Sequence, residues 1–489
     1  MASPSSASPR VAIIGAGFSG IAAAIALRKR GIEDFVIFDK FDGIGGTWWS
    51  NRYPGAEVDL ESHIYSFSFE RYDWSRTHVM WHELLDYLTM VATKWDLLGR
   101  IRLSEKVERV EWRSDQSAYR VTTSSGVDHG DFNAVISAVG FLNVPLIPPF
   151  ARGDHEFEGI LCHTSTWPDG VTMAGARVAV LGTGSSAVQI VTEAVNDAES
   201  VTIFQIEPNW MLPKDSRAYT PEERSRYRNW FTYQRERRRL YLGYDRRQAR
   251  SQHARRNGKA HQQRSAASLK FLRESLADRP DLIPLVTPEF PFEGRRTVIS
   301  DTYYPALMNP KVTLVPRAAA ALTHTGLIDA DGVERQFDII VMATGFEASK
   351  YLSSYTVIGE NGADLQQVWQ GEPEALLGMM VPGFPNFFMM YGPNTNAVPL
   401  VSFYEAQAAF ASALIAKLSG GRHRVIRVKP DVFRRYNDWL QAKLRDTVWA
   451  ETESYFKAGT GKVVSQWPVS SSAYILGTKL ARFIGVDVS

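Results

Sequence analysis

The stretch VAIIGAGFSGIAAAIAL, residues 11–27, decides the fold. Four apolar residues typical of a buried strand precede a turn with three glycines, and an apolar run typical of a buried helix follows. In such a unit the glycines permit a tight turn, let the backbone approach a diphosphate and bring helix against strand. The helix N-terminus also favours phosphate. The spacing predicts a dinucleotide site that contains Gly15, Gly17, Phe18, Ser19 and Gly20.

A second strand and an acid complete this unit. The run FVIF, residues 35–38, ends at Asp39, which lies 19 residues after Gly20 and precedes Lys40. An acid at this place can accept hydrogen bonds from ribose hydroxyls. A glycine turn alone can be an ordinary turn, but strand, helix and acid together favour a nucleotide site. Its N-terminal position indicates FAD, with Asp39 and Lys40 as further contacts.

The same pattern returns in RVAVLGTGSSAVQIV, residues 177–191, where Ala187 replaces the third glycine. The next apolar run, residues 201–204, leads to Ile206 and Glu207. No arginine stands there to bind a 2′-phosphate, whereas Glu207 can accept a bond from a 2′-hydroxyl. The predicted nicotinamide-cofactor contacts in this unit are Gly182, Thr183, Gly184, Ser185, Ser186, Gln189 and Glu207.

Two dinucleotide sites in one chain indicate hydride transfer from a nicotinamide to a flavin. Two unrelated nucleotide sites are the alternative. Apolar runs at residues 134–140 and 338–345 predict the strands that close each unit and lead back across a hinge. We therefore expect an α/β protein with two doubly wound, Rossmann-like dinucleotide-binding domains and a small helical insert.

The expected domains are interleaved along the chain. An FAD-binding domain takes residues 1–150 and 346–489, and a nicotinamide-binding domain takes residues 151–210 and 292–345. Residues 211–291 are rich in arginine, with apolar residues at helical spacing, and predict a helical insert over the nicotinamide domain. Acids are interspersed with its arginines, so a solvated helix surface is favoured over a membrane or an anionic partner.

Composition bounds the function. Of 489 residues, 44% are apolar, and 55 basic residues nearly balance 53 acidic ones. This balance does not favour nucleic acid or a membrane surface as a partner. Cys162 is the only cysteine, so thiol-pair redox chemistry is excluded and a reducing, cytoplasmic location is expected. No apolar run is long enough to predict a membrane span, and no metal site is expected.

Two further motifs carry a family resemblance. Residues 157–168, FEGILCHTSTWP, match the fingerprint F-x-G-x-x-x-H-T-x-x-W-P. Residues 45–59, GGTWWSNRYPGAEVD, match G-G-x-W-x-x-x-x-Y-P-G-x-x-x-D. In these motifs the chain resembles the flavin-dependent Baeyer–Villiger monooxygenases, type I, which depend on FAD and NADPH. Flavin monooxygenases that oxidise nitrogen or sulfur share the glycine turns but typically lack the Trp-Pro ending.

The resemblance implies a chemistry and its residues. Reduced flavin would capture O2 as a C4a-peroxide, whose anion attacks a ketone and yields an ester or lactone. Arginine suits the stabilisation of that anion because it keeps its charge. Arg296, seven residues before a Tyr-Tyr pair, matches the family's active-site arginine, and Asp59 matches the acid set against it. His163 fits a hinge or latch between the domains better than proton transfer.

The resemblance also extends the cofactor site. Arg295 stands where the family usually places a lysine near the cofactor's ribose phosphate, and the segment that contains Asn394 resembles the last FAD-contacting stretch. NADPH is the family's donor, but Ile206 leaves NADH as a serious competitor. The remaining residues expected to contact cofactor are Gly46, Thr47, Trp48, Tyr53, Asp59 and Tyr65.

The expected partners are a small-molecule ketone and O2, with the chain as a monomer or weak homo-oligomer. Two other functions stay open at this stage. One is a flavin monooxygenase acting on nitrogen or sulfur in small molecules. The other is a nucleotide-binding redox sensor without catalysis. A panel of ketones and sulfides, assayed for oxygenated products, distinguishes these functions.

Overall fold

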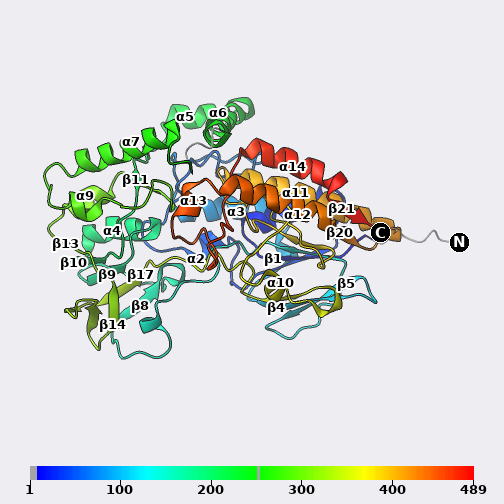
Figure 1. The fold of residues 1–489 in the computed structure, drawn as a ribbon, viewed down its shortest axis with the longest axis horizontal. Helices are drawn as coiled ribbons and strands as arrows, with labels where there is room; N and C mark the ends of the chain where they lie inside the picture. Colours follow the sequence, from blue (N-terminus) through cyan, green and yellow to red (C-terminus); the bar gives the residue numbers. More distant parts are fainter. Residues whose placement is uncertain (1–7, 250–253) are drawn as a thin grey trace.

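Two five-stranded parallel sheets organise the computed structural model, which describes residues 8–249 and 254–489 (Figure 1). The first sheet has the order β19 (Phe387–Met389), β7 (Ala134–Ser137), β1 (Val11–Ile14), β2 (Phe35–Phe38) and β3 (Ile101–Arg102). The second has the order β13 (Val312–Val315), β10 (Ser200–Phe204), β9 (Arg177–Leu181), β17 (Ile339–Met342) and β8 (Ile160–His163). The predicted α/β class with two doubly wound units is confirmed.

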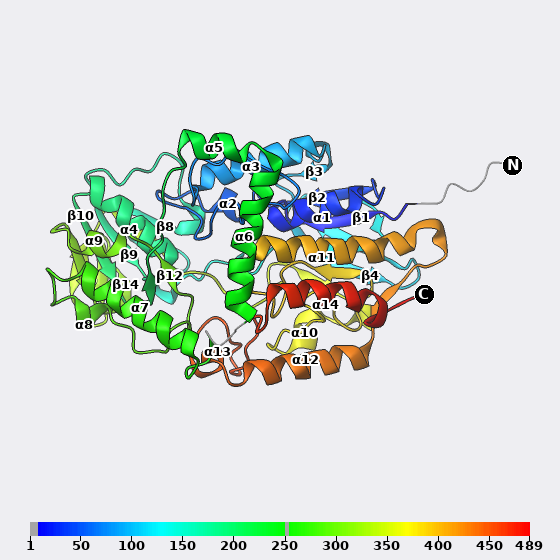
Figure 2. The same ribbon diagram turned by 90° about the horizontal axis from the view of Figure 1, so that it is seen from above.

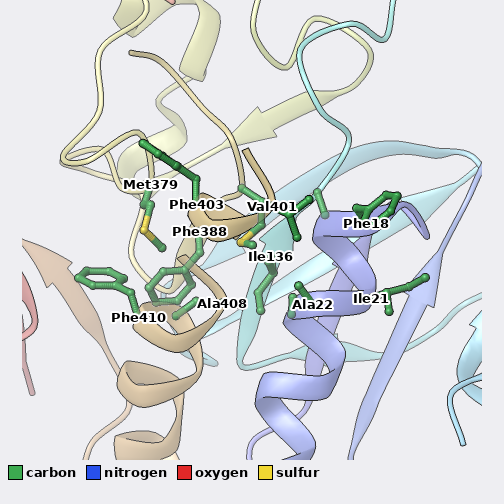
Figure 3. Packing of buried hydrophobic residues seen from close by; sticks show 14 of the residues in the cluster. Phe18, Ile21, Ala22, Ile136, Met379, Phe388, Val401, Phe403, Ala408 and Phe410 are labelled. Carbon is green, nitrogen blue, oxygen red and sulfur yellow. The ribbon is translucent and has the colours of Figure 1, made fainter. Parts of the chain in front are cut away.

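Both ends of the chain build the first domain. β19, from the C-terminal part, pairs with β7, which in turn pairs with β1. α1 (Phe18–Arg28) packs along α11 (Leu400–Ile415), and Figure 3 places Ala22 of α1 and Ala408 of α11 within this core. Small side chains on both helices permit this close approach. Residues more than 370 positions apart therefore share one hydrophobic core.

The middle of the chain builds the second domain in the same way. β9 lies between β10 and β17, and β17 also pairs with β8. The strands predicted in residues 134–140 and 338–345 are thus present, as β7 and β17. Each pairs directly with the strand that leads into a glycine turn, so each glycine turn lies beside a neighbouring strand end.

The glycine turns fit against those strand ends only because they lack side chains. A Cβ on Gly15 (φ +110°) would lie 2.6 Å from the carbonyl oxygen of Ala138, just after β7. A Cβ on Gly182 (φ +116°) would lie 2.7 Å from the carbonyl oxygen of Ala343, just after β17. The positive φ angles also favour glycine. In both domains, therefore, a glycine with a positive φ angle allows the turn to lie against the backbone that follows the neighbouring strand.

Smaller sheets and helices surround these two units. A mixed sheet has the order β18 (Thr356–Ile358), β4 (Val107–Arg113), β5 (Ala118–Thr123) and β6 (Asp131–Phe132). An antiparallel sheet has the order β14 (Ala319–Leu322), β15 (Gly326–Asp329) and β16 (Glu334–Gln336). A third, also antiparallel, pairs β20 (Ile426–Val428) with β21 (Val486–Val488). The other helices are α2 (Thr47–Ser50), α3 (Trp81–Lys94), α4 (Ser185–Asp197), α9 (Tyr303–Leu307), α10 (Leu365–Trp369), α12 (Pro430–Leu444), α13 (Val448–Glu451) and α14 (Ser471–Ile484). Among the described residues, no helix has the length and apolar character that crossing a bilayer requires.

The helical insert spans both domains instead of covering the second alone. It contains α5 (Pro221–Tyr227), α6 (Trp230–Ala249), α7 (Lys259–Ser275) and α8 (Ile283–Val286). α7 packs on the second domain, beside the short parallel pair β11 (Met211–Leu212) and β12 (Val298–Ile299). α6 lies across the first domain, next to α14 (Figure 2). The expectation that the insert covers the nicotinamide domain is therefore wrong for α6.

Buried polar contacts attach α6 to the first domain. The Arg237 guanidinium donates to the carbonyl oxygens of His63 at 2.5 Å and Ser66 at 2.7 Å. The Tyr233 hydroxyl accepts a bond from the Trp74 indole at 3.2 Å. Arg237 is 5% exposed, so this arginine does not belong to the solvated surface predicted for the insert. Sequence periodicity could not reveal these contacts because their partners lie about 170 residues upstream.

We predict that Arg237→Met destabilises the protein by about 2 kcal/mol, because two buried carbonyl groups lose their donor. The measurement is the free energy of unfolding from denaturant titration. Arg238→Met is the matched control, since Arg238 is exposed on the same helix. Equal stability of the two variants would contradict the proposed attachment of α6.

Candidate functional site

The first glycine turn forms a cradle without side chains. Gly17 precedes α1, and a Cβ added to Gly46 would lie 3.0 Å from the Gly17 Cα. Two glycine segments thus face each other at the N-terminus of α1, where backbone N–H groups favour an anion. The turn has the geometry that the diphosphate of a dinucleotide requires. These residues fit FAD.

Asp39 holds this turn in place. Its carboxylate accepts bonds from the backbone N–H groups of Ala16 at 2.6 Å and Phe41 at 2.9 Å. Burial raises the pKa of Asp39, although these two bonds oppose the shift. Each carboxylate oxygen retains a second lone pair, so a ribose contact remains a prediction. The neighbouring Lys40 ammonium donates to the Asn143 side chain at 2.7 Å.

The second signature motif connects the two domains. The Tyr53 hydroxyl lies 2.7 Å from the Gln189 side-chain oxygen and 3.1 Å from the Ser186 hydroxyl, both on α4. The Gln189 amide donates back to the Glu57 carbonyl oxygen at 3.0 Å. At Gly55 a Cβ would lie 2.9 Å from the Gln189 carbonyl oxygen. Three residues expected to contact cofactor therefore also contact one another across the domain boundary.

Several predicted contact residues direct their side chains into the protein. Phe18 packs edge-on against Tyr65, whose hydroxyl accepts a bond from the Trp48 indole at 3.1 Å. The Ser19 hydroxyl donates to the Ala138 carbonyl oxygen at 3.3 Å. The Asn394 amide donates to backbone carbonyls at residues 463 and 466. These side chains are bound within the protein, and their contacts with cofactor stay predictions.

Asp59 and Arg296 form an ion pair on a cavity of about 530 Å³ between the domains. Asp59 comes from the first domain, and Arg296 precedes β12 of the second. The charge of Asp59 raises the pKa of Arg296, whereas burial opposes that shift. Burial alone would raise the pKa of Asp59, but the charge of and bond from Arg296 outweigh it, and the pKa is lowered. Both groups therefore stay ionised at neutral pH.

A second ion pair, more deeply buried than the first, lies beside it and was missed from the sequence. The Lys214 ammonium is 2.6 Å from the Glu57 carboxylate and only 4% exposed. Burial lowers the pKa of Lys214, and the charge of Glu57 opposes this shift. Lys214 lines the same cavity as Asp59 and Arg296. Glu57 lies in the signature motif, two residues before Asp59, and could have been noticed there. The sequence around Lys214, however, does not identify Lys214 as the partner of Glu57.

His163 joins the two segments that connect the domains. Its Nδ1 accepts a bond from the Ser165 backbone N–H at 3.1 Å, so Nε2 carries the proton and donates to the Gly345 carbonyl oxygen at 3.0 Å. Burial lowers the pKa of His163 to about 4. A neutral imidazole with both nitrogens engaged fits the expected latch and not proton transfer.

An ion pair between Glu207 and Arg295 lies at the edge of the second glycine turn. The Glu207 carboxylate lies 2.6 Å from the Arg295 guanidinium, and the Thr183 hydroxyl donates to the Glu207 carbonyl oxygen at 2.7 Å. A Cβ on Gly184 would meet no atom within 4 Å, so the backbone before α4 is open to a ligand. These residues fit the diphosphate and ribose of a nicotinamide cofactor.

Known proteins share this architecture and sequence. Residues 12–235 match the family described as pyridine nucleotide-disulphide oxidoreductase. A Baeyer-Villiger monooxygenase of Pseudomonas aeruginosa is 35% identical over 94% of this chain and 87% of its own length. Another, of Streptomyces coelicolor, is 33% identical over 95% of this chain and 90% of its own length. This chain belongs to the Baeyer–Villiger monooxygenases.

Solved structures agree with this membership. A closed crystal structure of cyclohexanone monooxygenase has a TM-score of 0.88 and 28% identity, covering 98% of this chain and 99% of that one. A steroid monooxygenase bound to NADP has a TM-score of 0.88 and 26% identity, with 99% of each chain covered. The chain is therefore an oxidoreductase of this family. Disulphide chemistry is not part of it, because Cys162 is alone and burial raises the pKa of its thiol to about 12.

We predict that the protein loses stability as pH falls from about 6.5 to about 4. Burial lowers the pKa of His63, His78 and His163 to about 4 in the folded state. Within that window the unfolded chain binds protons that the folded chain does not, so unfolding becomes more favourable. His163→Gln should make this decline shallower, as measured by melting temperature against pH. His324→Gln, at an exposed histidine, is the control and should keep the wild-type slope.

Proposed function

We propose that this monooxygenase converts a small-molecule ketone to an ester or lactone, with O2 and a reduced nicotinamide as co-substrates. The balanced reaction joins ketone, O2, NADPH and a proton to give the ester or lactone, NADP+ and water. The observation that carries the proposal is the ionised pair of Asp59 and Arg296 on the cavity between two dinucleotide-binding domains.

FAD and NADPH are the cofactors. A relative from Aspergillus niger, 34% identical over 95% of this chain, is named an FAD-binding monooxygenase, and the steroid monooxygenase structure contains NADP. Bound FAD, reduced by the nicotinamide, supplies the electrons that activate O2. The turns that begin at Gly15 and Gly182 would hold the FAD and the NADPH diphosphates, respectively. Asp39 would orient the FAD ribose.

Arg296 is the proposed stabiliser of the negative charge that develops on oxygen during insertion. A guanidinium cannot lose its proton under working conditions, so its charge is permanent. Asp59 orients that guanidinium and offsets part of its desolvation cost. A preorganised cation at a partly dehydrated site stabilises developing negative charge more strongly than water does.

The neighbouring pair of Lys214 and Glu57 extends this charged wall. The Lys214 ammonium adds a second positive charge within electrostatic range of Asp59. The Glu57 carboxylate compensates the charge of the Lys214 ammonium. The pair therefore changes the electrostatic field in the cavity without adding net charge. We assign Lys214 a positioning role, in which it keeps Asp59 ionised.

The cavity size and the relatives guide the substrate class. The structural neighbours are named for cyclohexanone and steroid, and the cavity of about 530 Å³, which Arg295 of the nicotinamide site also lines, lies within the range of small-ligand sites. A neutral ketone needs no charged partner of its own. The single cysteine supports a cytoplasmic location. Membership of an enzyme family argues against a sensor role, and among the described residues that line the cavity no contact favours oxidation of sulfur or nitrogen.

We predict that Arg296→Ala lowers ester or lactone formation by about 10²- to 10³-fold. NADPH oxidation should continue and release hydrogen peroxide instead of product, because the stabilising charge is lost. The measurement is oxygenated product per NADPH consumed, with several ketones and sulfides as substrates. Arg296→Lys should recover part of the yield, since it retains charge but not the planar fork.

Arg435→Ala is the matched control. Arg435 forms an exposed ion pair with Asp431 on α12, at 3.1 Å, outside the cavity. This variant should keep the wild-type product yield. A full yield in Arg296→Ala, or products from sulfides but from no ketone, would overturn the proposal.

A further inference from the structure

The end of β10 places a charged pair at the edge of the second glycine turn. Residues 205–207 follow the strand, and the bond from the Thr183 hydroxyl ties the backbone of Glu207 to the turn at 2.7 Å. Ile206 is 80% exposed and has no polar group to offer a ligand. Glu207 is therefore the acid that this unit presents to a bound nucleotide.

Arg295 reaches the same place from a distant part of the chain. Its guanidinium lies 2.6 Å from the Glu207 carboxylate and 5.0 Å above the centre of the Phe290 ring. The ring and the carboxylate together fix the position of the cation. The side chains of Arg295 and Glu207 are 35% and 46% exposed, so both remain accessible to a ligand.

Acid and cation have opposite preferences at this position of a doubly wound fold. An acid after the second strand accepts bonds from ribose hydroxyls, whereas an arginine nearby accommodates a 2′-phosphate. Here the two groups are present together and paired with each other. We propose that the Glu207–Arg295 pair lets this enzyme bind NADH as well as NADPH, and that Glu207 limits its preference for NADPH.

The balance follows from charge. A 2′-phosphate gains Arg295 but must compete with Glu207 for it and is repelled by that carboxylate. A 2′-hydroxyl can donate to Glu207 while Arg295 stays bound, because a carboxylate accepts about four hydrogen bonds. The inference rests on the proposed function only in needing a nicotinamide at this turn. Its test therefore measures binding without any ketone.

The experiment is calorimetric titration of the FAD-loaded enzyme with NADP+ and with NAD+ at low and high salt. In the wild type, the two dissociation constants should differ by less than about a hundredfold. Glu207→Gln should tighten NADP+ relative to NAD+ by about tenfold, and Arg295→Gln should weaken NADP+ relative to NAD+. Salt should reduce both effects.

Glu334→Gln is the matched control, since Glu334 is an exposed acid on β16 of the same domain. It removes the same charge and should leave the ratio of dissociation constants unchanged. A wild-type preference for NADP+ above about a hundredfold, or an unchanged ratio in Glu207→Gln, would overturn the inference alone. Failure of both nucleotides to bind would overturn it together with the proposed function.

Discussion

The ion pair of Asp59 and Arg296 forms only when the two domains are held in one relative position. Asp59 follows a segment packed in the first domain, whereas Arg296 precedes β12 in the second. A charge pair at an interface is strong only at short range and where water is partly excluded. The rest of the structure can be understood by how it keeps these two side chains together.

Three contacts perform that task at different levels. Tyr53 binds α4 directly, so the loop before Asp59 is attached to the helix that follows the second glycine turn. His163 binds Gly345 and ties the two connecting segments together. The insert then spans both domains, with α6 on the first and α7 on the second. Because the contacts of Tyr53 and His163 are polar and partly buried, losing one partner leaves the other unsatisfied.

Local sequence was sufficient for the two nucleotide units but not for their surroundings. A strand, a glycine turn and a helix within residues 11–27 are specified by neighbouring residues, as are those within residues 177–191. Arg296 and Asp59 could be paired only through a family resemblance, since 237 positions separate them. The Lys214–Glu57 pair and the place of α6 depend on tertiary contacts that periodicity does not encode. Asn394 illustrates the same limit, because its amide is engaged by a loop about 70 residues further on.

The two ion pairs, three of whose four side chains line the cavity, also explain how a charged site can be stable. A lone lysine at the buried position of Lys214 would carry a large desolvation cost, and each acid compensates the charge of the cation that it faces. Asp59 and Glu57 belong to one signature segment, whereas Arg296 and Lys214 flank the short sheet of β11 and β12. One domain thus supplies both acids and the other both cations. Each cation therefore meets its acid only when the two domains are in contact. The same contact between the domains forms the cavity and stabilises the positive charges that line it.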